Sequence, residues 1–346
     1  LETLNKAQGG RINITGRVAV EEIEKLNFKA EIGMWQNGNF VVIKETEKEI
    51  EMIQPLLFIS QQVNGNSSYI ASPGETLHYK IFFRNIGSTP FEDLFMIVRL
   101  DGSVLDFSTI EARNKGQVQP NDNMIIWDYK DVSMLKNLNV QEEGFVEFYV
   151  KVKDNFLASG PDQASAVITT NVNLSQMTQN FTVKVNSGLT ISQKAFYKSF
   201  DMQNSGSIPP RVGQATTFTI QWDIRNYFSD AKNVRVKATL PQNVSLTGKI
   251  MPEWSNFLYD SASREVTWSP GDILAGTGVN GDPYMLSFQV SLVPSQSQKG
   301  STAPLISQVQ ISGENQFTGT LITAQNSGVN TSLPDDFENS GGGIVQ

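Results

Sequence analysis

The chain contains a single histidine, His78, and this limits two kinds of chemistry. A histidine base in a Ser-His-Asp relay must be oriented by a carboxylate, but the sequence neighbours of His78 are Leu77 and Tyr79. A histidine metal site needs two or more imidazoles, which one chain of this composition does not offer. We therefore expect His78 to be a surface side chain, and we expect no catalytic residues.

Paired carboxylates are the next candidates, because two carboxyl groups at a set separation can hydrolyse a glycosidic bond. The sequence offers two adjacent pairs, Glu142 with Glu143 and Asp335 with Asp336. Each pair lies on a predicted loop, where acidic side chains are ordinarily solvated. We therefore expect both pairs to belong to the solvated surface.

Calcium is the only metal for which the sequence offers candidate ligands. Two loops are rich in side-chain oxygen: Asn121, Asp122 and Asn123 in one, and Asn280 and Asp282 in the other. Neither loop fits the twelve-residue calcium loop with its closing glutamate, and Asn and Asp are also ordinary turn formers. Calcium is therefore a weak prediction at these residues, and no other cofactor is expected.

A glycan site would need exposed aromatic rings beside amides and carboxylates. Trp254, Phe257 and Tyr259 cluster in the second half of the chain and are the candidate ligand aromatics. If two or more of them were exposed in one plane, adhesion to a glycan would be favoured.

The elements that must position these residues are predicted to be mostly β-strands. Leu77, Tyr79, Ile81 and Phe83 alternate with the residues between them, and this period of two indicates a strand with one buried face. The same pattern returns at 217–224, and Gly, Pro and Asn turn signals separate many further short strands. Almost no helical periodicity is present. The sequence therefore predicts an all-β chain built from sandwiches.

One unit is repeated along the chain. The segment 57–61 (LFISQ) is echoed by 189–193 (LTISQ), and Arg84-Asn85 is echoed by Arg225-Asn226. Trp127 is echoed by Trp268 in a later predicted strand. The order of these landmarks is preserved, and their offsets drift slowly, as loop insertions would make them. Both tryptophans are expected to be core anchors.

The first 53 residues fit the back half of the same unit. Residues 11–18 resemble the predicted strand 145–152, and the two strands that follow lead into the next LFISQ segment. A half sandwich has an open edge and an uncovered apolar face. Its front strands could lie upstream in a longer parent protein, could be donated by a neighbouring molecule, or the fragment could cap the next domain.

The segment 72–87 (SPGETLHYKIFFRNIG) resembles the opening of a conserved Ig-like surface repeat of bacterial and archaeal cell-wall proteins, a domain of unknown function. Residues 238–241 (ATLP), 266–274 (VTWSPGDIL) and 311–319 (ISGENQFTG) resemble later parts of that repeat. The resemblance covers roughly residues 55–335 as two diverged copies. It implies an extracellular, wall-associated architecture, and it brings no catalytic residues.

Several positions depart from the family's pattern. Asn226-Tyr227-Phe228 stands where the first copy has Asn85-Ile86-Gly87, and Arg211-Val212-Gly213 stands where the first copy has Ser72-Pro73-Gly74. Physical chemistry explains part of the pattern without the family. Gly74 permits a tight turn before the strand, and Asn85 before Gly87 suits a turn with positive φ.

Composition narrows the functional class. The chain has 346 residues, no cysteine and a net charge of −8. An acidic chain is a poor partner for nucleic acid and anionic membranes, and no apolar run is long enough to be a transmembrane segment. The expected divisions are 1–53 as the back part of a sandwich repeat, 54–186 and 187–335 as Ig-like sandwiches, and 336–346 as a flexible Gly-rich tail or linker.

We therefore expect a non-catalytic extracellular module of a cell-surface or cell-wall protein, acting as a spacer, a surface-layer component or a filament component. Its partners would be other copies or domains of the same surface protein. Two alternatives remain open. The chain could be an adhesin that binds a glycan or protein ligand, or an accessory module of a larger extracellular enzyme.

Overall fold

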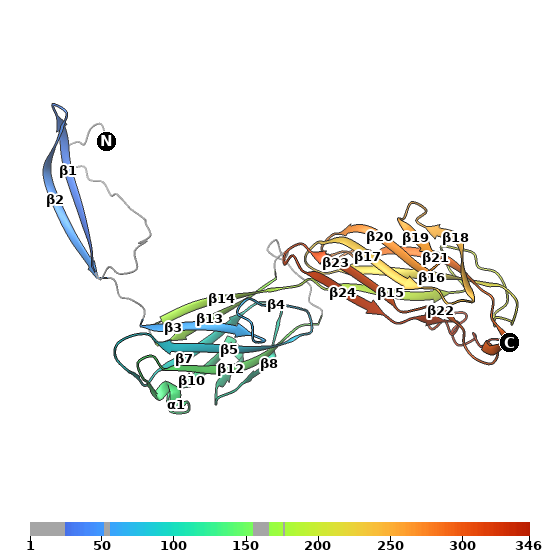
Figure 1. Ribbon diagram of the computed structural model, residues 1–346, viewed down its shortest axis with the longest axis horizontal. Coiled ribbons are helices and arrows are strands. Elements are labelled where there is room, and N and C mark those ends of the chain that lie inside the picture. The colour runs from blue at the N-terminus through green and yellow to red at the C-terminus, as the bar shows by residue number, and fades with distance from the viewer. Residues whose placement is uncertain (1–24, 52–55, 155–165, 176) are drawn as a thin grey trace. The chain divides into compact units, whose positions relative to one another are not determined.

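The computed structural model describes residues 25–51, 56–154, 166–175 and 177–346 (Figure 1). Its regular structure is nearly all strand, and the prediction of tandem Ig-like β-sandwiches is confirmed. Helical structure in these ranges consists of the four-residue α1 (Ser133–Lys136) and two 3-10 turns, η1 (Pro120–Asp122) and η2 (Gln296–Gln298). None of these described helices is long and apolar enough to cross a membrane.

The first sandwich spans residues 57–185 and has two main sheets (Figure 1). One sheet runs in the order β3 (Leu57–Val63), β5 (Thr76–Asn85), β12 (Glu143–Val152) and β8 (Leu105–Ala112). The other runs β4 (Ile70–Ala71), β14 (Met177–Val185), β13 (Val167–Leu174), β7 (Phe95–Asp101), β10 (Met124–Asp128) and β9 (Gln117–Gln119). A small separate pair consists of β6 (Phe91–Glu92) and β11 (Asn137–Leu138).

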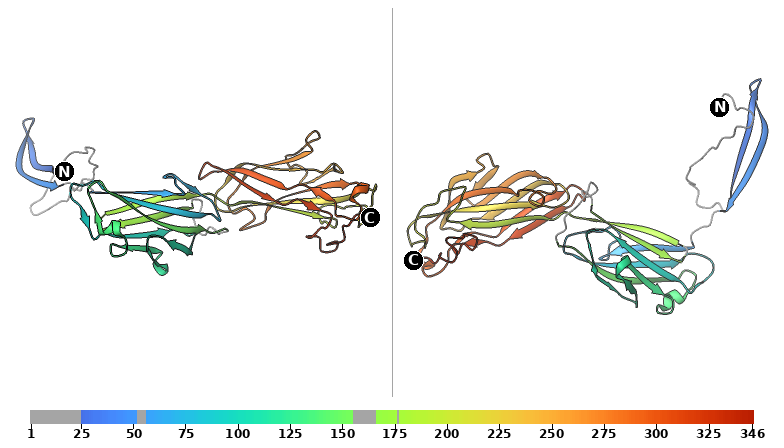
Figure 2. Two further views of the ribbon diagram at one scale, coloured as in Figure 1. Left: turned by 60° about the horizontal axis from the view of Figure 1, so that its bottom comes forward. Right: turned by 180° about the vertical axis from the view of Figure 1, so that it is seen from behind.

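The second sandwich begins at residue 189 and also has two main sheets (Figure 2). One sheet runs β15 (Leu189–Phe196), β16 (Thr216–Asn226), β21 (Tyr284–Leu292) and β18 (Val244–Met251). The other runs β19 (Phe257–Asp260), β20 (Glu265–Ile273), β17 (Ala231–Thr239), β23 (Val309–Asn315) and β24 (Leu321–Asn326). A small pair joins β22 (Pro304–Ile306) to β25 (Val329–Asn330).

The two sandwiches follow the same strand order. The sheet β3-β5-β12-β8 corresponds to β15-β16-β21-β18, and the run β14-β13-β7-β10 corresponds to β24-β23-β17-β20. In both cases the last two long strands of the unit form an antiparallel hairpin. A shared topology is what an ordered sequence repeat predicts, because equivalent segments then have equivalent neighbours.

Each sandwich buries the apolar side of its alternating strands in a core of its own. The inward residues of β5 and the matching residues of β16 are fully buried, as the period of two predicts. Trp127 and Trp268 are buried, so their prediction as core anchors is confirmed. The indole Nε1–H of Trp127 donates a hydrogen bond to the Arg113 carbonyl oxygen at 2.9 Å, which meets its one polar requirement.

The N-terminal unit contains a hairpin of β1 (Lys25–Gln36) and β2 (Asn39–Glu51), which within the described residues pair only with each other. Lys29 makes ion pairs with Glu31 at 2.9 Å and with Glu45 at 2.8 Å on a charged side of the hairpin. Large apolar side chains of the hairpin are exposed: Phe28, Ile32, Met34, Trp35, Phe40, Val41, Val42 and Ile43. An isolated two-stranded hairpin is marginal in water. That this hairpin is the back half of a sandwich stays a prediction, and the predicted strand at 11–18 lies outside the described residues.

Of the two turn residues interpreted from the sequence around the first core strand, the structure agrees with one and disagrees with the other. Gly74 has φ of +79°, and its counterpart Gly213 has φ of +72°, so both use the conformation that favours glycine. Asn85 is instead a buried, extended residue at the end of β5, and its interpretation as a positive-φ turn residue is wrong. Its Nδ2 donates to the Thr89 and Leu138 carbonyl oxygens, so its amide side chain connects the loop after β5 with β11.

The C-terminal residues differ from the flexible tail that the glycines suggested. Leu333 and Val345 are buried in the core of the second sandwich. The N–H of Val345 donates to the Ser301 carbonyl at 3.0 Å, and the N–H of Gln346 donates to the Pro210 carbonyl at 2.9 Å. Apolar residues on both sides of the glycine run therefore anchor the segment, which covers the end of the sandwich.

Candidate functional site

The outer face of the sheet β5-β12-β8 carries the single histidine. The His78 ring stacks on Tyr149 with centroids 4.5 Å apart, because the two residues are directly opposed across β5 and β12. His78 Nε2 lies 3.5 Å from Oε1 of Glu147 and makes no hydrogen bond in the described structure. A carboxylate thus does face the histidine, from the neighbouring strand, where sequence adjacency could not reveal it. No nucleophile is paired with the imidazole among the described residues.

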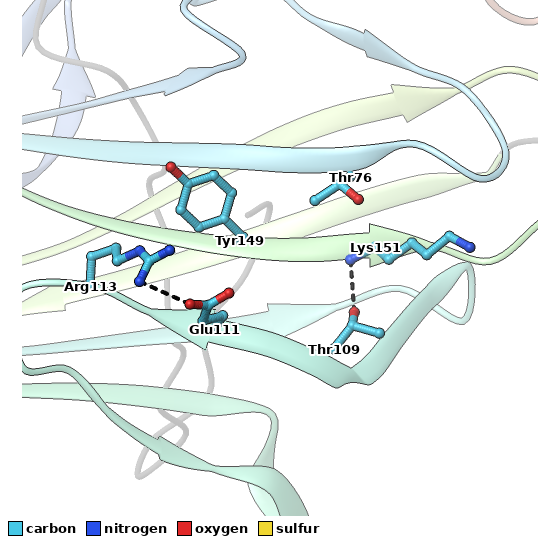
Figure 3. Close-up of a pocket in the computed structure, with 6 residues that line it drawn as sticks. All are labelled: Thr76, Thr109, Glu111, Arg113, Tyr149 and Lys151. Carbon is cyan, nitrogen blue, oxygen red and sulfur yellow. Dashed lines mark hydrogen bonds and ion pairs between the residues drawn. The ribbon is translucent and has the colours of Figure 1, made fainter.

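A groove of about 260 Å³ lies beside this pair (Figure 3). Arg113 Nη1 and Glu111 Oε1 form an ion pair at 2.9 Å, and the Lys151 N–H donates to Thr109 Oγ1 at 2.8 Å. The Arg113 guanidinium lies over the Tyr149 ring, 5.5 Å from its centroid. The tyrosine ring is therefore engaged by its own neighbours, and the groove offers polar groups rather than a free aromatic platform.

The three predicted ligand aromatics are not brought into one surface. Phe257 packs 4.8 Å from Phe288 and 6.3 Å from Trp222, measured between ring centroids, so its ring joins the core of the second sandwich. Trp254 is 77% exposed, and Tyr259 lies partly exposed on the edge strand β19. A glycan contact at Trp254 and Tyr259 stays a prediction.

The predicted calcium residues serve local turns. Asn121 and Asp122 lie in η1, and Asn123 follows with φ of 52°. Asn280 donates its N–H to the Gly276 carbonyl at 3.0 Å, and the Asp282 carbonyl accepts the Gly278 N–H at 3.2 Å. Over the described ranges, no group of three or more His, Cys, Asp or Glu side chains could hold a metal ion. Calcium at these loops stays a prediction.

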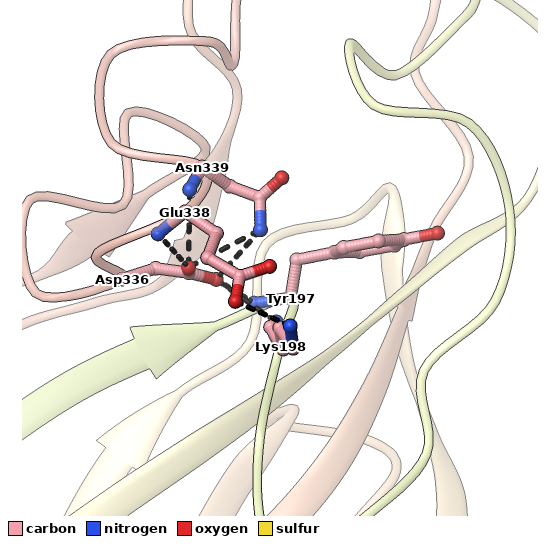
Figure 4. Close-up of polar contacts among 5 residues, drawn as sticks. All are labelled: Tyr197, Lys198, Asp336, Glu338 and Asn339. Carbon is pink, nitrogen blue, oxygen red and sulfur yellow. Dashed lines mark hydrogen bonds and ion pairs between the residues drawn. The ribbon is translucent and has the colours of Figure 1, made fainter.

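One predicted surface carboxylate is instead a buried anchor (Figure 4). Asp336 is 2% exposed, so its prediction as a solvated group is wrong. Its Oδ2 accepts the N–H groups of Tyr197 at 2.8 Å and Lys198 at 2.9 Å, and its Oδ1 accepts those of Glu338 and Asn339 at 3.1 Å each. The Lys198 ammonium forms an ion pair with the Glu338 carboxylate across the same contact. We call these five residues the Asp336 knot.

The electrostatics of the knot favour the ionised carboxylate. Desolvation raises the pKa of Asp336, but the Lys198 N–H, the Asn339 side chain and the other backbone donors outweigh it, and its pKa is lowered below the ordinary value. The sequence did carry a signal for this role. Asp is a residue type that forms Asx-turns, in which the carboxylate accepts backbone N–H groups a few residues further along the chain.

The segment between the two sandwiches contains two buried polar residues. Asn186 Oδ1 accepts hydrogen bonds from Thr318 at 2.6 Å and Thr320 at 2.8 Å, both in the second sandwich. Its backbone N–H donates to the Ala71 carbonyl at 2.8 Å, and its Nδ2 donates to Ser72 Oγ at 3.3 Å, both in the first sandwich. One asparagine therefore bonds to both sandwiches.

Ser187 and Phe228 complete this junction. Ser187 Oγ donates to Asn226 Oδ1 at 3.1 Å and accepts the Phe228 N–H at 3.0 Å. Phe228 is buried within the hydrophobic core cluster of the first sandwich, although it belongs to the chain of the second. Phe228 occupies the position where the first copy has Gly87, so the departure from Asn-x-Gly was the sequence signal for this contact.

Comparison with known proteins matches part of the chain to a family model. Residues 59–185 match the family model described as a domain of unknown function, DUF7619. No curated protein matches the chain. Among solved structures, it is similar to the C-terminal domain of the Streptococcus pyogenes antigen I/II-family protein AspA, at 12% identity and a TM-score of 0.28, covering 79% of this chain and 100% of that one. The C-terminal domain of the Streptococcus agalactiae AgI/II polypeptide BspA gives the same four values.

Proposed function

We propose that this chain is a non-catalytic structural module of a cell-surface protein, in which two sandwiches act as one stiff spacer. The observation that carries the proposal is the junction of Asn186, Ser187 and Phe228. A flexible linker between domains is ordinarily exposed and makes few contacts. Here the linking residues are buried, and each of their side chains is bonded or packed.

Sequence properties support a location outside the cell. The chain stabilises each sandwich without cysteine, through cores that contain buried tryptophans. Residues 72–87 resemble the opening of a wall-associated Ig-like repeat, and the acidic composition suits a solvated surface protein.

Backbone ¹⁵N relaxation of the full chain tests the stiff spacer. The sandwiches should share one rotational correlation time, because Asn186 and Phe228 hold them together. Joint replacement by Asn186→Ala and Phe228→Ser should give two shorter, separate correlation times, while each sandwich keeps its amide spectrum. A matched control is Asn243→Ala, whose side chain bonds to Gln298 within the second sandwich, and it should leave the common correlation time unchanged. Independent tumbling of the wild-type sandwiches would refute the proposal.

The surface location needs its own test. Antibodies raised against the second sandwich should label intact, unpermeabilised cells that produce this protein. Labelling only after permeabilisation would contradict the location and leave the stiffness unaffected. Two alternative proposals remain: adhesion to a glycan or protein ligand, and service as an accessory module of an extracellular enzyme. The same cells could be used to compare them.

A further inference from the structure

The second sandwich has a slot that the spacer role does not use. The slot has a volume of about 470 Å³, within the ordinary range of ligand sites. One wall is the turn after β15, from Lys198 to Asp201, and the other is the C-terminal segment from Asp335 to Glu338. Its floor includes the outward side chains of Gln221 on β16 and Met285 on β21.

Two phenylalanines stand at this slot with their rings in solvent. Phe200 is 111% exposed and Phe337 is 104% exposed, the highest values for large apolar side chains in the described part of the chain. One of them lies on each wall. Exposed single apolar residues are common and need no explanation. Two fully exposed aromatic rings that flank one cavity form an apolar patch, and such a patch indicates a binding function.

The walls that carry the phenylalanines are held in place. Lys198 and Glu338 belong to the Asp336 knot, which joins the two walls directly (Figure 4). Asp201 is held from below, because Ser287 Oγ on β21 donates a hydrogen bond to its Oδ2 at 2.7 Å. The rings are therefore presented from anchored backbone on both sides, and a ligand would not have to order the walls first.

The net negative charge of the slot favours a ligand that carries positive charge. Four carboxylates line it, those of Asp201, Asp335, Asp336 and Glu338, together with one ammonium group, that of Lys198. Glu338 is paired with Lys198, and Asp201 with Ser287, whereas Asp335 makes no hydrogen bond or ion pair within the described residues. The slot thus combines an apolar rim with an unpaired carboxylate.

We propose that this slot binds a peptide segment of a partner protein in which one lysine or arginine lies between apolar side chains. The apolar side chains would cover Phe200 and Phe337, and the cationic group would lie against Asp335. Charge complementarity argues for the basic residue, and the rings on both walls argue for apolar groups on both sides of it. The inference does not depend on the spacer function, since the slot lies within one sandwich.

Isothermal titration of the full chain with two peptides tests the proposal. The probe is acetyl-Leu-Lys-Leu-amide, and the matched peptide, acetyl-Leu-Gln-Leu-amide, lacks only the charge. The lysine peptide should bind saturably, and the glutamine peptide should bind roughly fivefold more weakly, as expected for one partly exposed ion pair. Asp335→Asn should remove this difference between the two peptides.

Variants of the rim separate the slot from other exposed apolar groups. Phe200→Ser and Phe337→Ser should each weaken the lysine peptide about tenfold, because each removes a large covered surface. Leu258→Ser, an exposed residue on β19, should leave its affinity within about twofold. Unchanged melting temperatures would show that all variants fold.

Three results would overturn the inference. Equal affinity for the two peptides would mean that the site is only apolar, and an absence of saturable binding would mean that it takes no such segment. Self-association of the wild-type chain in sedimentation, lost in Phe337→Ser, would assign the rim to contacts between copies of this chain.

Discussion

Gln61 on β3 and Gln193 on β15 occupy equivalent positions in the two sandwiches and have different surroundings. Each faces inward, and each is paired across the sheet with one residue of the next strand, Ile81 for Gln61 and Trp222 for Gln193. Gln193 Oε1 accepts the Trp222 indole N–H at 2.7 Å. Gln61 Oε1 is buried without a hydrogen-bond partner in the described structure.

The rest of each amide continues the contrast. Gln193 Nε2 donates to the carbonyl oxygens of Ser307 at 2.9 Å and Ser327 at 3.0 Å, so this one side chain connects β15 with the segments just before β23 and just after β24. The comparison teaches that a repeat can retain a buried polar residue in both copies while only one copy gives it a complete set of partners. The energetic roles of the two glutamines should therefore differ.

The largest expected effect is at Trp222, the partner that distinguishes the two copies. Trp222→Ala removes a fully buried indole that packs against Phe288 and Trp268, and it leaves Gln193 Oε1 without its donor. We expect a loss of about 4 kcal/mol in the free energy of unfolding of the second sandwich. Chemical denaturation measures it, with the exposed Trp254→Ala as a control near zero. A loss below about 1 kcal/mol would contradict this reading of the second core.

The ends of the two sandwiches supply a second comparison. Asn186-Ser187-Gly188 follows the last hairpin of the first sandwich, and 326–328 (NSG) begins at the last residue of that hairpin in the second. After the first, the chain starts a new sandwich; after the second, it turns back through β25 and is held by Asp336. The knot thus closes an end that in the first copy is closed by the next domain.

Asp336→Ala should therefore cost about 3 kcal/mol in the second sandwich, since it removes the buried carboxylate that accepts four backbone N–H groups. The adjacent Asp335→Ala is the matched control and should change stability by less than about 0.5 kcal/mol. Thermal unfolding of both variants measures the difference. Equal effects would show that the knot does not close the sandwich.

The same carboxylate gives a pH dependence with a defined sign. The pKa of Asp336 is lower in the folded chain than in the unfolded chain, so ionisation stabilises the fold. This contribution is present above the unfolded pKa, about 3.9, and is lost as pH falls through the folded value. The stability difference between wild type and Asp336→Ala should therefore shrink below about pH 4, and a difference that grew there would contradict the assignment.

Sequence reasoning reached the fold through local patterns and missed features that depend on distant residues. The period of two at Leu77–Phe83 and the echoed tryptophans predicted the sandwiches and their cores, because both signals depend on short-range alternation. The burial of Phe228 in another sandwich's core depends on which loop meets which domain. The Asp336 knot depends on backbone N–H groups just after β15, more than 130 residues away. The slot exists only once these two segments are side by side.

A smaller effect is expected at Gln193 itself. Gln193→Leu keeps the size of the side chain but leaves the Trp222 N–H and two carbonyl oxygens without partners. We expect a loss of about 2 kcal/mol, the usual cost of buried polar groups left unsatisfied. Hydrogen exchange of the β16 amides reports on this sandwich. Exchange as slow as in the wild type would show that these groups find other partners.

The smallest effect is expected at Gln61, where the same substitution makes the comparison decisive. Gln61→Leu removes a buried oxygen that has no hydrogen-bond partner and adds an apolar group facing Ile81. Stability of the first sandwich should be unchanged or higher by up to about 1 kcal/mol, since no partner is left unsatisfied. Exchange of the β5 amides measures it. A loss as large as that of Gln193→Leu would mean that a buried water, bonded to Gln61, already supplies the partner that Trp222 supplies in the second sandwich.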